Sequence, residues 1–194
     1  MMHEKLWEKI TTLDPEKTAK RTKCKYLTDS ATYTLVLLGQ EYLVDINKKQ
    51  IVTPGQKAKP DFLQSLCILT YIINAVNIPL SEKIVTANKL EAGQFFFRGP
   101  HALPVDKLEK AFGSNPAMLL KAGENLSAEK CDYGDASIKV LVLPRLPVYF
   151  VIWAGDEEFP PRASILLDQT AARQLPYDAL WTAVNLTTKA LINH

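Results

Sequence analysis

The sequence predicts an α+β fold, a single domain over residues 1–194 in which a mainly antiparallel sheet is covered by helices. Three apolar segments rich in β-branched residues, 137–143, 148–153 and 163–167, are separated by proline-bearing turns and predict adjoining strands of one antiparallel sheet. The helical patterns are grouped between strands, and this order favours α+β over a repeating βαβ fold. A hydrophobic fraction of 47% with 23% charged residues is typical of a globular protein.

Two short helices are predicted at the start of the chain. Leu6, Trp7 and Ile10 have the spacing of an amphipathic helix. Asp14 and Pro15 then have the residue types preferred at the N-cap and at the first position of a second helix.

A β-hairpin follows these helices. Residues 32–38 and 41–46 are rich in β-branched and aromatic side chains, and the connection Gly39-Gln40 has the leading glycine of a tight hairpin turn. Residues 51–52 continue the pattern as a third strand.

The middle of the chain predicts one buried helix and several shorter elements. Residues 62–76 are strongly apolar behind an acidic start at Asp61, but they fall short of the roughly 20 residues that cross a bilayer. We therefore expect a core helix and no membrane partner. The other predicted elements are strands at 84–87 and 94–97, surface helices at 105–112 and 116–122, and a last helix from Pro176 that covers one sheet face with Tyr177, Leu180, Trp181, Val184 and Leu191.

The clearest candidate site follows the strand at residues 148–153. Asp156, Glu157 and Glu158 come just after this strand and precede Phe159 and two prolines. If the chain stays extended there, Asp156 and Glu158 project to the same side, because side chains alternate along a strand. Two carboxylates held that close disfavour each other's ionisation, so the pair needs a cation, a bound proton or full solvation.

Two interpretations of this acidic segment involve cations. In the first it is a solvated turn whose charge is balanced by Arg162 or Arg145. In the second it binds a divalent metal through Asp156, Glu158 and Asp168, since hard cations prefer carboxylate oxygens.

The third interpretation is acid or base catalysis by the same carboxylates, with His101 nearby. His101 is the only histidine away from the termini; it lies in a turn-forming segment, where it either titrates near neutral pH or simply faces water. The sequence contains no glycine-rich phosphate loop, no H-E-x-x-H and no G-x-S-x-G, which excludes the enzyme classes that depend on them. It therefore assigns no catalytic residue and no cofactor.

The charge and cysteine patterns limit the classes of partner and the cellular compartment that we expect. Basic residues concentrate early in the chain, but no aromatic or glycine-loop pattern for base recognition accompanies them, so no nucleic-acid partner is predicted. The three cysteines have no metal-binding or paired spacing and indicate reduced thiols. The first residues lack the apolar core of a secretory signal, and we expect a cytoplasmic protein.

The order of several motifs resembles that of a known family. The string W-x-G-D-E-E-F-P at residues 153–160 is the most specific element, and it lies between L-P-R-L-P at 143–147 and L-L-D at 166–168. Weaker matches are at residues 13–16, 38–42 and 175–180. Over nearly the whole chain the sequence resembles the bacterial and archaeal family called domain of unknown function 3786.

The resemblance implies no established activity and transfers no catalytic residue. It implies an accessory role near redox or one-carbon chemistry of anaerobes, because members are sometimes joined to a four-cysteine iron-sulfur domain related to a segment of corrinoid iron-sulfur proteins. This chain lacks that segment, so a separate protein would have to supply any cluster.

We therefore expect a cytosolic binding or accessory protein with an iron-sulfur or corrinoid protein as its partner. The alternative is a small enzyme that uses the acidic segment to bind a metal or to transfer protons. The candidate residues for the ligand or partner site are Asp156, Glu157, Glu158, Asp168, Arg145, Arg162, Trp153 and His101.

Overall fold

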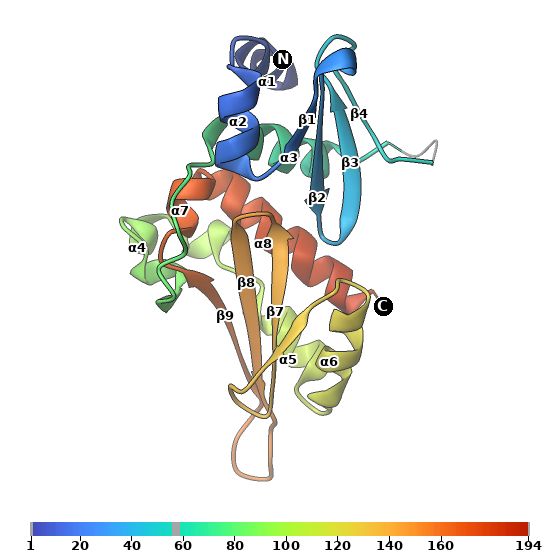
Figure 1. Ribbon diagram of the computed structural model, residues 1–194. Coiled ribbons are helices and arrows are strands. Elements are labelled where there is room, and N and C mark those ends of the chain that lie inside the picture. The colour runs from blue at the N-terminus through green and yellow to red at the C-terminus, as the bar shows by residue number, and fades with distance from the viewer. Residues whose placement is uncertain (1, 56–58, 194) are drawn as a thin grey trace.

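The computed structural model describes residues 2–55 and 59–193 and shows an α+β fold (Figure 1). Helices lie beside two antiparallel sheets, so the predicted fold class is confirmed. The hairpin and the C-terminal strands lie in separate sheets, whose buried side chains nonetheless belong to one hydrophobic core. Within the described residues no helix is both long and apolar enough to cross a membrane.

The first sheet has the strand order β1-β2-β3-β4 and follows two helices. Asp14 caps the second of these helices as predicted, since its carboxylate accepts the N–H of Lys17 at 2.9 Å. The elements of this part are α1 (Met2–Thr11), α2 (Pro15–Thr22), β1 (Lys25–Leu27), the 3-10 turn η1 (Thr28–Ser30), β2 (Thr32–Leu37), β3 (Gln40–Asp45) and β4 (Gln50–Val52).

The predicted hairpin is confirmed, but its turn comes one residue earlier than expected. Leu37 pairs with Gln40, so Leu38 and Gly39 form the connection, with φ angles of 52° and 77°. Two residues of positive φ match the twist of the strands that they join. The N–H of Leu38 donates to the carbonyl of Val142 at 3.0 Å, which fastens the hairpin tip to the second sheet.

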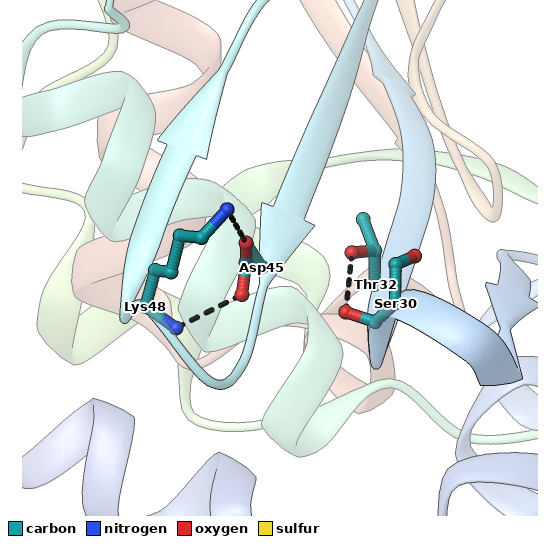
Figure 2. Close-up of polar contacts among 4 residues, drawn as sticks. All are labelled: Ser30, Thr32, Asp45 and Lys48. Carbon is teal, nitrogen blue, oxygen red and sulfur yellow. Dashed lines mark hydrogen bonds and ion pairs between the residues drawn. The ribbon is translucent and has the colours of Figure 1, made fainter.

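Side-chain contacts close the other end of the hairpin (Figure 2). Asp45 accepts the backbone N–H of Lys48 at 2.9 Å and forms an ion pair with its Nζ at 3.5 Å. Thr32, which pairs with Asp45 in the strand register, donates its hydroxyl to the carbonyl of Ser30 at 3.0 Å. These contacts fix the turns that precede β2 and follow β3.

The second sheet has the order β5-β9-β8-β7-β6, so the three predicted apolar strands are neighbours as expected. The short strand expected at residues 84–87 is also present and pairs with the last strand, whereas the strand at 129–131 was not predicted. The strands are β5 (Ile84–Thr86), β6 (Glu129–Cys131), β7 (Ala136–Leu143), β8 (Leu146–Trp153) and β9 (Arg162–Asp168).

The longest helices pack against one another at the centre of the molecule. α3 (Phe62–Asn74) contacts α8 (Tyr177–Ile192), and α8 also contacts α5 (Val105–Phe112), α6 (Ala117–Glu124) and α7 (Ala171–Gln174). In Figure 1, α8 passes behind β7 and β8. Leu180, Val184 and Leu191 are buried as predicted, but Trp181 is only partly buried.

The predicted strand at residues 94–97 is wrong. This segment is the short helix α4 (Gly93–Phe96), between the 3-10 turns η2 (Ala87–Lys89) and η3 (Gly99–His101). The rings of Phe96 and Phe97 pack on Tyr177 of α8, with centroids 5.5 and 5.2 Å away. A run of aromatic residues can thus form a short helix that packs on another helix. The composition of the run alone did not distinguish this helix from a strand of a sheet.

Candidate functional site

The candidate site lies at one end of the second sheet, where the β6–β7 turn meets the β8–β9 turn. Figure 1 shows the β8–β9 connection projecting at the bottom of the view, beyond the strands that it joins. We call this end the acidic tip and define it by its exposed residues: Asp132, Tyr133, Asp135, Asp156, Glu157, Glu158 and Phe159.

Asp156 holds its own turn closed. Its backbone N–H donates to the carbonyl of Phe159 at 2.9 Å, and its Oδ1 accepts the N–H groups of Glu158 at 2.8 Å and Phe159 at 2.7 Å. Aspartate commonly stabilises turns in this way. The chain is therefore not extended here, so the condition under which Asp156 and Glu158 were expected to project to the same side is not met.

The base of this turn is fastened to the C-terminal end of α5. The N–H of Gly155 donates to the carbonyl of Gly113 at 3.3 Å, and the N–H of Ala163 donates to Oε1 of Glu109 at 3.1 Å. A Cβ atom at Gly155 would lie 2.7 Å from Cδ of Pro161, so the two sides of the turn approach closely only with glycine at this position. A Cβ atom at Gly113 would lie 2.4 Å from Cβ of Pro161, so the approach of the turn to the end of α5 also requires glycine. The tip is thus anchored on both sides of its turn.

The β6–β7 turn lies beside this base. Oδ2 of Asp135 accepts the N–H of Ala154 at 2.8 Å, and the N–H of Asp135 donates to the carbonyl of Ile152 at 2.9 Å. Gly134, with a φ of 57°, lies so close to Trp153 that a Cβ atom would be 3.2 Å from its ring. Two turns separated by about 20 residues in the sequence therefore form one surface.

Aromatic side chains and unpaired carboxylates share this surface. Phe159 is 65% exposed and Tyr133 is 45% exposed. Arg162 lies over the ring of Trp153, 5.4 Å from its centroid, which is the geometry of a cation–π contact. Within the described part of the chain, neither Glu157 nor Glu158 forms an ion pair. The expected balance of the acidic turn by Arg162 is thus not formed.

Arg145 lies at the β7–β8 turn, at the opposite end of these strands from the acidic tip. Its Nε donates to the carbonyl of Arg21 at 2.7 Å, its Nη1 to the carbonyl of Ile78 at 3.2 Å, and its Nη2 to Oδ1 of Asn77 at 2.5 Å. Arg145 therefore joins the sheet to the end of α2 and to the segment after α3 instead of balancing the acidic segment.

Asp168 is also placed away from the tip, because it ends β9 whereas Arg162 begins it. These two positions are six steps apart along an extended strand, which places them about 20 Å from each other. The carboxylate is buried and accepts hydrogen bonds from Ser81, from Glu82 and from Thr170. Burial alone would raise the pKa of Asp168, but the hydrogen bonds from Thr170 and Ser81 outweigh it and hold the pKa below its usual value.

The proposed metal set of Asp156, Glu158 and Asp168 is consequently not brought together. Among residues 2–55 and 59–193, no group of three or more His, Cys, Asp or Glu side chains is arranged to hold a metal ion.

His101 belongs to a separate aromatic cluster. Its ring stacks on Phe96, with centroids 4.5 Å apart, and meets the edge of Trp181 at 5.9 Å. His101 precedes α5, whereas the acidic tip contacts Gly113, the residue after α5. The length of this helix, about 12 Å, therefore lies between them. The arrangement of Asp156 or Glu158 beside His101 that acid–base catalysis requires is therefore not formed.

The sequence alone did not indicate that Asp132, Tyr133 and Asp135 belong to the site. Their turn carries a local signal, since Gly134 follows an acidic and an aromatic residue just before an apolar strand. That signal indicates a turn, but the pairing of β7 with β8 is what brings it beside the acidic segment.

Comparison with known proteins gives one result. A family model described as Domain of unknown function (DUF3786) matches residues 14–190, which is nearly the whole chain. No curated protein and no solved structure shows a significant match.

Proposed function

We propose that this chain, which belongs to the family described as a domain of unknown function (DUF3786), is a cytosolic binding or accessory protein that docks a partner protein on its acidic tip. The observation that carries the proposal is the position of Phe159. This large apolar side chain is 65% exposed at the end of a turn that Asp156 and the contacts to α5 hold in place.

A fixed aromatic side chain is an efficient contact residue. Phenylalanine buries a large apolar area, and binding does not have to order a turn that is already ordered. Tyr133, exposed on the adjoining turn, supplies a second aromatic ring with a polar end. Aromatic residues of this kind dominate the energy of many protein interfaces.

The carboxylates around these rings favour a partner with a basic surface. The acidic tip holds five carboxylates, and the one guanidinium at its base, that of Arg162, already lies against Trp153. Exposed ion pairs add little affinity one by one, about 0.2–1 kcal/mol each. Their main effects are faster association and selection against acidic partners.

We further propose that the partner is an iron-sulfur or corrinoid protein. The family resemblance supports this choice, and the cysteines are consistent with a cofactor carried by a separate protein. Cys24 and Cys67 are buried, Cys131 is half-buried, and no metal-binding group forms within the described residues.

Co-purification with matched variants tests the proposal. The tip variant carries Glu157→Gln, Glu158→Gln and Phe159→Ala. The controls are Phe95→Ala, since Phe95 is also 65% exposed, and Glu8→Gln on α1. Each protein is immobilised and incubated, without oxygen, with extract of the organism that encodes the chain. Partners are identified by mass spectrometry and by their absorption spectra, then purified for affinity measurements.

We expect one cofactor protein to bind the wild type and both controls, and to bind the tip variant at least about tenfold more weakly. Equal retention by all four proteins, with unchanged melting temperatures, would contradict docking on the acidic tip.

A further inference from the structure

A cavity of about 350 Å³ runs along α8 between the start of α3 and the start of α5. It lies on the face of α8 that carries Trp181, Asn185 and Ile192, four and seven residues apart, which places their side chains in one row. Its size is within the range of about 300–1,000 Å³ typical of small-molecule sites. At about 30 Å³ for each water-sized group, it has room for roughly a dozen non-hydrogen atoms.

The walls of this α8 cavity are mainly apolar. Trp181, Leu186 and Ile192 line it from α8, and Leu63 lines it from α3. Leu63 is 44% exposed and Ile192 is 37% exposed, although both lie beside buried parts of the core helices. These surfaces leave apolar area that a ligand with an apolar body would cover.

One buried polar group lines the same cavity. Thr188 is only 1% exposed, and its hydroxyl has no hydrogen-bond partner in the part of the chain that the structure describes. On the same helix, Thr182 and Thr187 donate to the carbonyls four residues earlier at 2.8 Å, so Thr188 is an exception. An unpaired buried hydroxyl is unfavourable, and a polar atom of a ligand would relieve it once the Thr188 side chain rotates towards the cavity.

The rim of the α8 cavity carries two lysines. Lys107 of α5 and Lys189 of α8 line it, and neither forms an ion pair within the described residues. Asp61 is the one acidic side chain on the lining, but its Oδ1 accepts the N–H of Gln64 at 2.8 Å as the N-cap of α3. The N-terminal end of α3 stabilises the negative charge of Asp61, so this carboxylate does not need a lysine as its partner. The two lysines therefore remain available for a ligand.

We propose that the α8 cavity binds a small amphipathic carboxylate, with its apolar body against Trp181 and Leu63 and its charged group near Lys107 and Lys189. The proposal does not depend on docking at the acidic tip, because the cavity lies among α3, α5 and α8 and shares no residue with the tip.

Binding of octanoate to the full-length protein tests this proposal, with octylamine and octanol as probes of opposite and zero charge. The readout is the set of three tryptophan indole N–H signals in an NMR titration, with the Trp181 signal assigned from a Trp181→Phe variant. We expect octanoate to shift the Trp181 signal saturably while the Trp7 and Trp153 signals stay in place. Octylamine should not compete, and octanol should bind more weakly than octanoate.

Two variants and one control locate the contacts. Leu63→Trp fills the cavity and should abolish the shift. Lys107→Gln with Lys189→Gln should weaken octanoate binding roughly 2- to 30-fold and leave octanol binding unchanged. The control Lys20→Gln, on α2, should have no effect.

The proposal is overturned if octanoate gives no saturable shift at Trp181, if octylamine binds as well as octanoate, or if Leu63→Trp melts like the wild type and still binds. The tip variant should bind octanoate like the wild type, so failure of either proposal can be recognised separately.

Discussion

Asp156 and Phe159 are joined by two hydrogen bonds: Oδ1 of Asp156 accepts the N–H of Phe159 at 2.7 Å, and the carbonyl of Phe159 accepts the N–H of Asp156 at 2.9 Å. The first acidic residue of the segment is thus used to shape the turn, while Phe159 is left 65% exposed at its end. The carboxylate of Asp156 thus has a structural role, whereas those of Glu157 and Glu158 remain available for a partner.

Replacing Asp156 by asparagine and by alanine should have different effects. Asparagine keeps an oxygen that accepts the two N–H groups, so Asp156→Asn should leave the free energy of unfolding nearly unchanged. Asp156→Ala removes both side-chain hydrogen bonds and should lower it by about 1 kcal/mol, with faster amide exchange at Glu158 and Phe159. Denaturant unfolding and hydrogen exchange measure these effects, and equal behaviour of the two variants would contradict the role of Asp156 in the turn.

Arg145 should contribute to stability through its three hydrogen-bond contacts. Arg145→Ala leaves carbonyls of Arg21 and Ile78 without their charged donor and should lower the free energy of unfolding by about 2–3 kcal/mol. Arg145→Lys should recover little of this lost stability, because one ammonium group cannot donate to all the acceptors that the guanidinium group contacts. Thermal or denaturant unfolding measures the change, and the exposed Arg173, replaced by alanine, is the control with an expected effect within about 0.5 kcal/mol.

Asp168 should make stability depend on acidic pH. The pKa of Asp168 in the folded state lies below the ordinary value of 3.8. Its contribution to the free energy of unfolding is therefore fully present at pH values above 3.8 and is lost as the pH falls through the folded-state pKa. Asp168→Asn should therefore be less stable than wild type by about 1–3 kcal/mol near pH 7. Urea unfolding between pH 7 and pH 2.5 should show this difference shrinking below about pH 4. A difference independent of pH would contradict the prediction.

The three thiols should differ in reactivity. Burial raises the pKa of Cys24 to about 11 and that of Cys67 to about 12, so both thiols stay protonated at pH 8 and are shielded from reagents. Cys131 is half-buried, although burial also raises its pKa. Alkylation with iodoacetamide followed by mass spectrometry should first label Cys131, and Cys131→Ser should remove this early product. Labelling of Cys24 or Cys67 at the same rate in the folded protein would contradict the buried positions.

Local sequence patterns were sufficient for many elements of the fold. The apolar, β-branched composition of β7, β8 and β9 identified three strands, because β7 and β8 are buried along most of their length and β9 is buried at every second position and at its end. The start of α2 was predicted from its Asp-Pro cap. The strands β1 and β6 were not predicted, since both are three residues long, largely exposed and carry lysine, which is common at sheet edges.

The candidate site was only partly predictable, because it depends on contacts between distant segments. The sequence identified the acidic segment and Trp153, but Asp135 reaches Ala154 only through the pairing of β7 with β8. The placement of Asp168 depends on strand direction, which puts it at the far end of β9. The α8 cavity depends on how α3 and α5 pack around one helix, and the apolar stripe of α8 indicated only that Trp181 would be buried.

Site-specific photo-crosslinking tests docking on the acidic tip most directly. A photoreactive phenylalanine analogue is placed at position 159 in one protein and at position 95, equally exposed, in another. Both are irradiated with the cofactor protein recovered by co-purification. We predict an efficient crosslink from position 159 that weakens as salt is raised, and almost none from position 95. Crosslinking from position 95 alone, or equally from both positions, would contradict the proposal that the acidic tip is the partner surface.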